Sequence, residues 1–171
     1  MVVRRTACLA VSEGIVASYV HNQVAPGLGR IGVLVALQSS GKTSVLAEFG
    51  RQLAMHVAAA NPVALDLAGV PPEVTEREKA ILAEKNQGKP PQVIEKIMES
   101  GLKSFAKENC LLDQAFVIDP TRSVTQAVQQ AAAEAGTAIA VTAFARFRIG
   151  EGVEKEEEDF AAEVARTAAG G

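Results

Sequence analysis

Residues 35–46, VALQSSGKTSVL, hold side chains whose types and spacing could bind a nucleotide. The positions that fit a loose phosphate-loop pattern, with Ala in place of its first Gly, are Ala36, Gly41, Lys42 and Thr43. In such a loop the backbone amides surround the phosphates, the Lys reaches the outer ones, and the Ser or Thr hydroxyl holds magnesium. A small phosphate-loop protein that uses Lys42 and Thr43 is therefore one hypothesis for the function.

The pattern is weak evidence for a nucleotide site. Four loosely specified positions match by chance in roughly one chain in a hundred of this length. The fold also requires a parallel sheet built from repeated strand–helix–strand units, whereas the strand before this loop is expected to pair in a hairpin. Asp119, at the end of FVID, could pass for the carboxylate that supports the metal, but an Asp before Pro is typical of a turn. The competing interpretation of residues 35–46 is a polar surface loop.

The remaining reactive side chains do not gather into a catalytic pattern. His21 lies on a predicted strand beside a loop and is expected to make a surface contact or to pack its ring. His56 follows Leu53 on the apolar side of a predicted helix, which favours a buried core histidine. Cys8 and Cys110 lack metal-ligand spacing. No metal site and no cofactor are predicted, and the chain is not expected to be an enzyme.

Composition narrows the class of protein further. The 171 residues carry a net charge of −3 and no basic block, so direct DNA or RNA binding is not expected. No apolar stretch approaches the length of a membrane span, and residues 1–11 lack the order of a secretion signal. The predicted location is the cytoplasm.

The first half of the chain predicts a hairpin followed by a helix. Residues 15–21 and 30–38 have β-type patterns and are separated by NQVAPGLG, which contains the Pro and Gly residues of a loop. A helical apolar pattern follows, made by Leu46, Phe49, Leu53 and Val57. Because Pro disfavours helix in the residue before it, this helix is expected to stop ahead of Asn61-Pro62.

Residues 66–111 are rich in Glu, Lys and Gln and predict two helices separated by NQGKPP. Gly88 suits the end of the first helix, and Pro90-Pro91 suits the start of the second. The second helix carries an apolar stripe at helical spacing: Ile94, Ile97, Met98, Leu102 and Phe105. The first helix has only a thin apolar stripe and cannot cover these side chains fully. We therefore expect the hairpin to protrude from the core and to form a homodimer through the stripe of the second helix.

The last third predicts a strand, a helix, a second strand and a final helix. QAFVIDP is expected to be a strand that ends at Pro120. Ser123 with Gln126 forms a plausible capping box for a helix that Gly136 terminates. The alternating residues of the next strand, expected on one face, are Ile139, Val141, Ala143, Ala145, Phe147 and Ile149.

These elements predict an α+β fold, with a small antiparallel sheet, packed helices and an inserted antiparallel helical hairpin. We expect a core subdomain made by residues 1–65 and 112–152. Residues 66–111 form the dimerisation arm, and residues 153–171 form a C-terminal helical module.

Four stretches, taken in order, closely resemble bacterial elongation factor Ts: RIGVLVAL, GRQLAMHVAAANP, FVIDPTRSVTQAV and RFRIGEGVEKEEEDFAAEVA. The most specific are AMHVAA, at 54–59, and the terminal GEGxEKxExDFAAEVA pattern. The resemblance covers almost the whole chain. It implies a guanine nucleotide exchange factor that binds the translational GTPase EF-Tu in its GDP form, distorts its magnesium and phosphate site, and promotes GDP release.

The resemblance also implies a set of partner-binding residues. His21 matches a family histidine at the EF-Tu interface, and Val117 with Ile118 matches an apolar pair that packs against the β-barrel domain of EF-Tu. We expect this pair to leave the strand and to present both side chains at an edge. Other positions where the family contacts its partner are Arg51 and Gln52 on the first helix, and Phe160 and Val164 in the terminal module.

The family normally begins with a small helical domain and a first half-core that contains a Thr-Asp-Phe-Val motif. This chain is expected to contain only the second half-core, the arm and the terminal module, which make the partner-binding half of the factor. Two alternatives stay open: the phosphate-loop protein, and a dimeric structural fragment held together by its arm.

Overall fold

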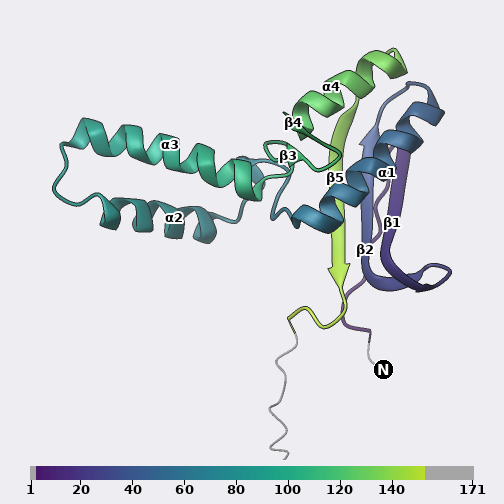
Figure 1. Ribbon diagram of the computed structural model, residues 1–171, viewed down its shortest axis with the longest axis horizontal. Helices are drawn as coiled ribbons and strands as arrows, with labels where there is room; N and C mark the ends of the chain where they lie inside the picture. Colours follow the sequence, from purple (N-terminus) through teal and green to yellow (C-terminus); the bar gives the residue numbers. More distant parts are fainter. Residues whose placement is uncertain (1–2, 153–171) are drawn as a thin grey trace, which may run out of the picture.

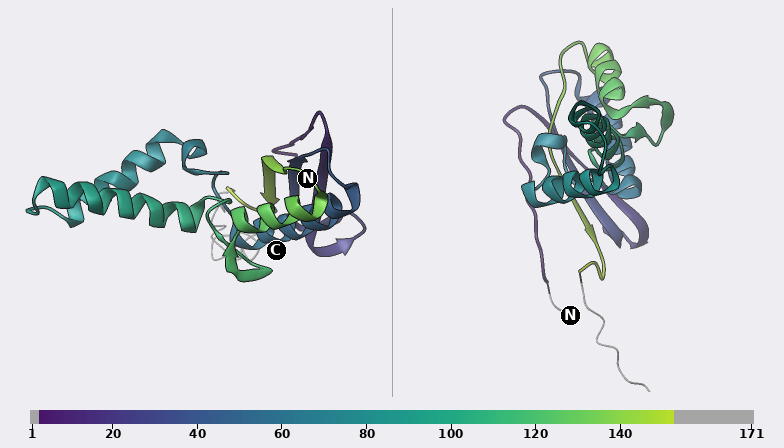
Figure 2. Two further views of the ribbon diagram at one scale, coloured as in Figure 1. Left: turned by 90° about the horizontal axis from the view of Figure 1, so that it is seen from above. Right: turned by 90° about the vertical axis from the view of Figure 1, so that its left-hand side faces the viewer.

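The computed structural model describes residues 3–152 and shows an α+β fold, as expected (Figures 1 and 2). Its strands are β1 Gly14–Ala25, β2 Leu28–Gln38, β3 Ala115–Phe116, β4 Asp119–Ser123 and β5 Ala140–Arg148. Its helices are α1 Thr43–Ala60, the short 3-10 helix η1 Leu67–Gly69, α2 Pro72–Lys85, α3 Pro91–Asn109 and α4 Val124–Ala135. The predicted terminal helix lies outside the described residues.

A three-stranded antiparallel sheet in the order β1-β2-β5 forms one layer of the core. The predicted hairpin of β1 and β2 is confirmed, but its expected eight-residue loop is wrong. Pairing continues to Ala25 and Leu28, which leaves only Pro26-Gly27 as the turn. Gly27 has a φ of +74°, a left-handed conformation that Gly adopts without a steric cost. Strands β1 and β2 therefore extend beyond the residues 15–21 and 30–38 that have the apolar pattern.

The alternation predicted along β5 is broken by a bulge. Leu37 pairs with Val141 and Ala36 pairs with Ala143, so Thr142 is an extra residue in the ladder. An extra residue moves all later side chains to the opposite face. Phe144, which was expected on the more exposed face, accordingly packs against the core. Phe147, which was expected with the apolar residues, lies on the other face beneath Arg5.

Helices α1 and α4 cover one face of the sheet (Figure 1). The core between these layers is made by apolar side chains of several elements, including Val33, Val35, Leu37, Leu46, Leu53, Val57, Leu111, Phe116 and Val124. Helix α1 lies close to the sheet at Gly50, where an added Cβ would lie 2.7 Å from the Cβ of Ala17. The absent side chain lets the helix lie directly on β1.

The helix ends follow the sequence signals. Helix α1 stops at Asn61, which has a φ of +50°. The capping box of α4 is present: the Ser123 hydroxyl accepts from the Gln126 amide, and the Gln126 side chain accepts from the Ser123 amide. Gly136 ends α4 in the left-handed conformation. These three predictions are confirmed.

Helices α2 and α3 form an antiparallel pair that projects away from the sheet (Figures 1 and 2). Helix α2 ends earlier than Gly88 indicates, at Lys85 with Asn86 as its cap, and Gly88 lies in the following turn with a φ of +85°. Pro90-Pro91 begins α3, as the sequence indicates. The two helices approach each other closely at Gly101. A Cβ added there would lie 2.4 Å from a methyl group of Leu82.

The arm is attached through a neck where residues 63–65 run beside residues 109–112. The Val63 amide donates to the Asn109 carbonyl over 2.8 Å, and the Leu111 amide donates to the Ala64 carbonyl over 2.9 Å. A small second core, made by Ala64, Val70, Ala106 and Cys110, fills the base of the arm. No helix in the described part of the chain, residues 3–152, is long and apolar enough to cross a membrane.

Candidate partner-binding surface

A two-stranded hairpin, β3 with β4, carries the candidate site. The expected strand through Pro120 is wrong, because the chain turns back at Val117-Ile118 and Phe116 pairs with Asp119. Pro120 can lie in β4 since the partner β3 has only two residues and leaves most of β4 without a ladder neighbour. The turn therefore places two adjacent apolar residues at the tip of a very short hairpin.

Both residues of this turn point outward. Val117 is 47% exposed and Ile118 is 46% exposed, whereas the preceding Phe116 is buried. The Phe116 ring packs against Phe49, at a centroid distance of 6.3 Å, and against His56, at 5.7 Å. Phe116 thus anchors the hairpin to α1, and the apolar pair is presented at an edge, as the sequence predicts.

The carboxylate of Asp119 braces the far side of the turn. It accepts from the Thr121 hydroxyl over 2.6 Å and from Arg122 Nε over 2.7 Å. These bonds favour the ionised form, and the Thr121 hydroxyl, with Arg122 second, holds the pKa of Asp119 below its usual value. The carboxylate of Asp119 therefore stabilises the turn, as the Asp-Pro sequence suggests, and is not arranged to support a metal ion.

The imidazole of His56 holds the near side of the turn. His56 is 0% exposed, as the sequence predicts, and its Nδ1 lies 3.1 Å from the Val117 amide. Because that amide can only donate, Nδ1 accepts and the proton sits on Nε2, which donates to Gln114 Oε1 over 2.9 Å. Gln114 Nε2 then donates to the Glu108 carbonyl over 2.8 Å. The structure thus requires a single neutral tautomer at His56.

The candidate residues on α1 lie beside the hairpin. Arg51 is exposed and Gln52 is half-buried. A shallow groove between α1, α4 and the hairpin is lined by Phe49, Gln52, Phe116, Arg122, Ala127 and Ala131, among others. Gln52 therefore shares a surface with the hairpin, while Arg51 lies on the solvent side of the same turn of helix.

His21 lies on β1, an edge strand of the three-stranded sheet. The Tyr19 hydroxyl lies 3.1 Å from His21 Nδ1, and the two rings are 5.9 Å apart. No hydrogen bond or ion pair within residues 3–152 joins His21 to the Val117–Ile118 turn. The structure thus brings Gln52 and the β3–β4 hairpin together in one groove and leaves His21 on a separate element. Phe160 and Val164 lie outside the described residues.

The loop of the phosphate-loop hypothesis has the wrong surroundings for that chemistry. Its preceding strand belongs to an all-antiparallel sheet. The Gly41 amide donates to Ser39 Oγ over 3.2 Å, and the Lys42 amide donates to the Ala135 carbonyl over 3.3 Å. Amides that would surround a phosphate are already used inside the protein. The geometry therefore favours the surface-loop interpretation.

Comparison with known proteins decides the family. A family model described as "Elongation factor TS" matches residues 1–151. The chain belongs to the elongation factor Ts family. An elongation factor Ts of Bradyrhizobium sp. (strain ORS 278) is 60% identical over 164 residues, covering 95% of this chain and 53% of that relative.

Two further elongation factors Ts show the same coverage. The protein of Xanthobacter autotrophicus is 58% identical over 168 residues, covering 98% of this chain and 55% of the relative. That of Methylobacterium sp. (strain 4-46) is 56% identical over 171 residues, covering 99% of this chain and 56% of the relative. The chain spans about half the length of the elongation factors Ts it matches.

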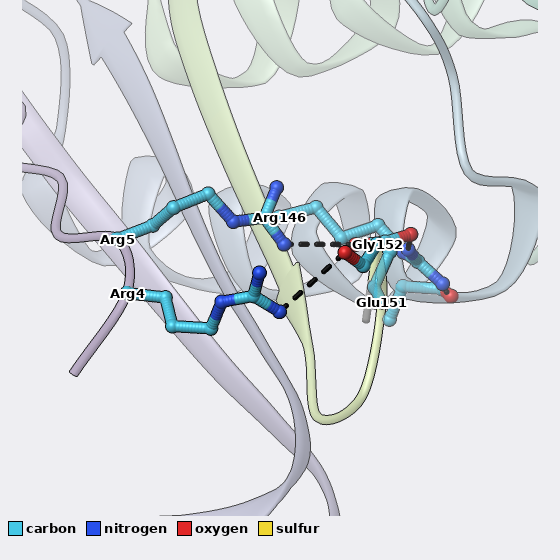
Figure 3. Close-up of polar contacts among 6 residues, drawn as sticks. Arg4, Arg5, Arg146, Glu151 and Gly152 are labelled. Atoms are coloured by element: carbon cyan, nitrogen blue, oxygen red, sulfur yellow. Dashed lines mark hydrogen bonds and ion pairs between the residues drawn. The ribbon is translucent and has the colours of Figure 1, made fainter. Parts of the chain in front are cut away.

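Two polar clusters of this elongation factor Ts chain are not indicated by local sequence patterns. One is the bond series from Val117 through His56 to Gln114. The other joins the Glu151 carboxylate to Arg5 over 3.4 Å and to Arg146 over 3.3 Å (Figure 3). Their members are separated by up to 146 residues in the chain, so no local pattern indicates that they meet.

Proposed function

We propose that the chain binds EF-Tu·GDP and promotes GDP release, as an exchange factor that hydrolyses no nucleotide itself and acts in the cytoplasm. Family membership supports the identity of the partner. The observation that carries the proposal is the Val117–Ile118 turn, where two half-exposed apolar side chains stand side by side on an anchored hairpin. Exposed apolar side chains on a rigid support are typical anchors of a protein interface.

The proposed surface extends from this turn to Arg51 and Gln52 on α1, and His21 on β1 forms a second contact. The terminal module around Phe160 and Val164 is proposed to contact EF-Tu as well. Polar residues at the rim of an interface contribute less to affinity than apolar anchors at its centre. We therefore expect Ile118 and Val117 to dominate the affinity of the described part.

We also propose that the chain forms a homodimer through its arm. The stripe residues of α3, Ile94, Ile97, Met98, Leu102 and Phe105, are only half-buried. Among the described residues of α2 and α3, Ala106 alone is fully buried, at the base of the arm. The outer arm therefore keeps apolar area that a second copy could cover.

Calorimetric titration of EF-Tu·GDP tests the binding surface. Ile118→Ala is expected to weaken binding several-fold, because anchors commonly contribute more than about 1 kcal/mol, with little change in the melting temperature of the free chain. Val93→Ala is the matched control, since Val93 is 42% exposed but lies on the arm. A strong loss of stability with unchanged affinity would place Ile118 in the core and the interface elsewhere.

Release of a fluorescent GDP from EF-Tu tests the exchange step separately. Faster release in the presence of the chain supports exchange, whereas binding without faster release restricts the function to partner binding. Lys42→Ala is expected to leave both measurements unchanged. GTP binding by the isolated chain that Lys42→Ala abolishes would instead support the phosphate-loop function.

A further inference from the structure

The hairpin that carries Val117 and Ile118 is too short to hold its own shape. Its ladder consists of two residue pairs, Ala115 with Ser123 and Phe116 with Asp119, and the register shifts between them. An isolated two-stranded hairpin is marginal in water even when it is longer. The conformation of the turn therefore depends on contacts with the rest of the protein.

One of these contacts is made at the backbone of the turn itself. The Val117 amide donates to His56 Nδ1 over 3.1 Å inside a site where the imidazole is fully buried. The bond is part-buried and its acceptor is fully buried, so water competes with it less than with an exposed bond. The bond also fixes the point at which the chain turns outward, immediately after the buried Phe116.

The other nitrogen of His56 extends this contact to the neck of the arm. Nε2 donates to Gln114, and Gln114 donates to the carbonyl of Glu108 in the last turn of α3. A ring held at both nitrogens has one orientation and one tautomer. The end of α3, the start of the hairpin and the turn thus share one continuous hydrogen-bonded unit.

We infer that His56 is the positioning residue of the partner-binding turn, an inference that rests on the proposed function. His56 is fully buried, so its side chain is not presented at the surface. It acts by holding the Val117 amide, so that Val117 and Ile118 are presented in one arrangement before EF-Tu arrives. Fixing a binding segment beforehand lowers the entropic cost of association.

His56→Phe tests the inference, because Phe keeps a ring against Phe116 and removes both hydrogen bonds. Two readouts follow the turn: native-state hydrogen exchange of the Val117 amide, and affinity for EF-Tu·GDP. Loss of one protecting bond is expected to speed exchange at Val117 by about tenfold. Affinity is expected to fall several-fold.

A double-mutant cycle with Ile118→Ala separates positioning from simple destabilisation. If His56 acts through the turn, His56→Phe weakens binding less in the Ile118→Ala chain than in the unmodified chain. Equal losses in both chains, or an unchanged Val117 exchange rate, would overturn the positioning role. Gln114→Leu is the second variant should His56→Phe fail to fold, and it is expected to speed Val117 exchange less, because Nδ1 keeps its bond.

The two proposals fail in different ways. If the unmodified chain does not bind EF-Tu·GDP, the proposed function is wrong before any variant is compared. Val117 exchange in His56→Phe then still decides whether the imidazole anchors the turn. If the unmodified chain binds but His56→Phe binds equally well, only the positioning role is wrong.

Discussion

The neutral state of His56 is set by its surroundings. Burial lowers the pKa of His56 from its ordinary value, and the hydrogen bond to Gln114 offsets part of that effect. Protonation would also place a proton on Nδ1, where the Val117 amide already points its hydrogen. The folded chain therefore resists protonation at a position where the unfolded chain accepts a proton near pH 6.5.

This difference predicts a loss of stability in mild acid. Below about pH 6.5 the unfolded state binds a proton at His56 that the folded state does not, so the free energy of unfolding falls as pH falls. For one such group the slope approaches about 1.4 kcal/mol per pH unit. Urea unfolding between pH 7 and pH 5 is expected to show this fall in the unmodified chain.

His56→Phe is the control for that measurement, and its curve is expected to be flatter over the same interval. The comparison isolates His56, because every other titratable group is present in both chains. Parallel curves for the two chains would show that protonation of His56 does not oppose folding.

At the residue scale, the sequence predicted the burial of His56 but not its role. Burial follows from the helical spacing of apolar residues around it. Its partners, Gln114 and Val117, are 58 and 61 residues away, and no local pattern specifies that they meet. Capping was predictable for the opposite reason, since Ser123 and Gln126 are three residues apart and bond within one turn of helix.

Among the elements, α3 presents an apolar stripe that α2 covers only in part. Ile97 lies in the middle of that stripe and is half-buried within one chain. Ile97→Glu is expected to convert the proposed dimer to a monomer, because it places a charge in an apolar seam. Light scattering measures the mass, and circular dichroism confirms that the helices persist.

Val93→Glu is the matched control for the dimer, because Val93 lies on the same helix, is 42% exposed and is not part of the stripe. It is expected to leave the mass unchanged. If Ile97→Glu has the same mass as the unmodified chain, the stripe serves only to pack α3 against α2.

The sequence mispredicts β5 and the β3–β4 hairpin for the same physical reason. The extra residue Thr142 in β5 depends on register with β2, which is a property of two strands and not of either sequence. Likewise, the residues around Val117 have a strand pattern, and only the pairing of Phe116 with Asp119 turns them into a hairpin. Element types were predictable from local patterns, whereas the face of a side chain after a bulge was not.

In the whole molecule, three distant segments are joined through the pair Arg146 and Glu151 (Figure 3). Arg146, whose side chain is 9% exposed, donates to Glu151 and to the Ala58 carbonyl near the end of α1. Arg5 of the N-terminal segment donates to the same carboxylate. The segment before β1, the end of α1 and the end of β5 are therefore tied together through Arg146 and the carboxylate of Glu151.

Glu151→Gln is expected to destabilise the chain by about 1–3 kcal/mol, because it leaves the nearly buried Arg146 without its counter-charge. Arg5→Gln removes the exposed ion pair with Glu151 and the contact of the guanidinium with the Phe147 ring, and is expected to cost at most about 1 kcal/mol. Thermal and urea unfolding of both variants measure the difference. Equal costs would mean that the burial of Arg146 adds nothing to its pairing with Glu151.

The core and the arm have separate apolar clusters, so the core is expected to fold without the outer arm. Val70 and Ala106 lie in one small cluster at the base, so their chain segments are close enough for a flexible linker of about ten residues to replace residues 72–105. The replacement keeps that cluster, the neck and the Glu108 carbonyl that Gln114 binds. Because the main core between the sheet, α1 and α4 contains no residue of α2 or α3, we expect one cooperative thermal transition and unchanged affinity for EF-Tu·GDP. We also expect a monomeric mass by light scattering. A molten core would show that the arm stabilises the fold, and a persistent dimer would place the contact between copies outside the arm.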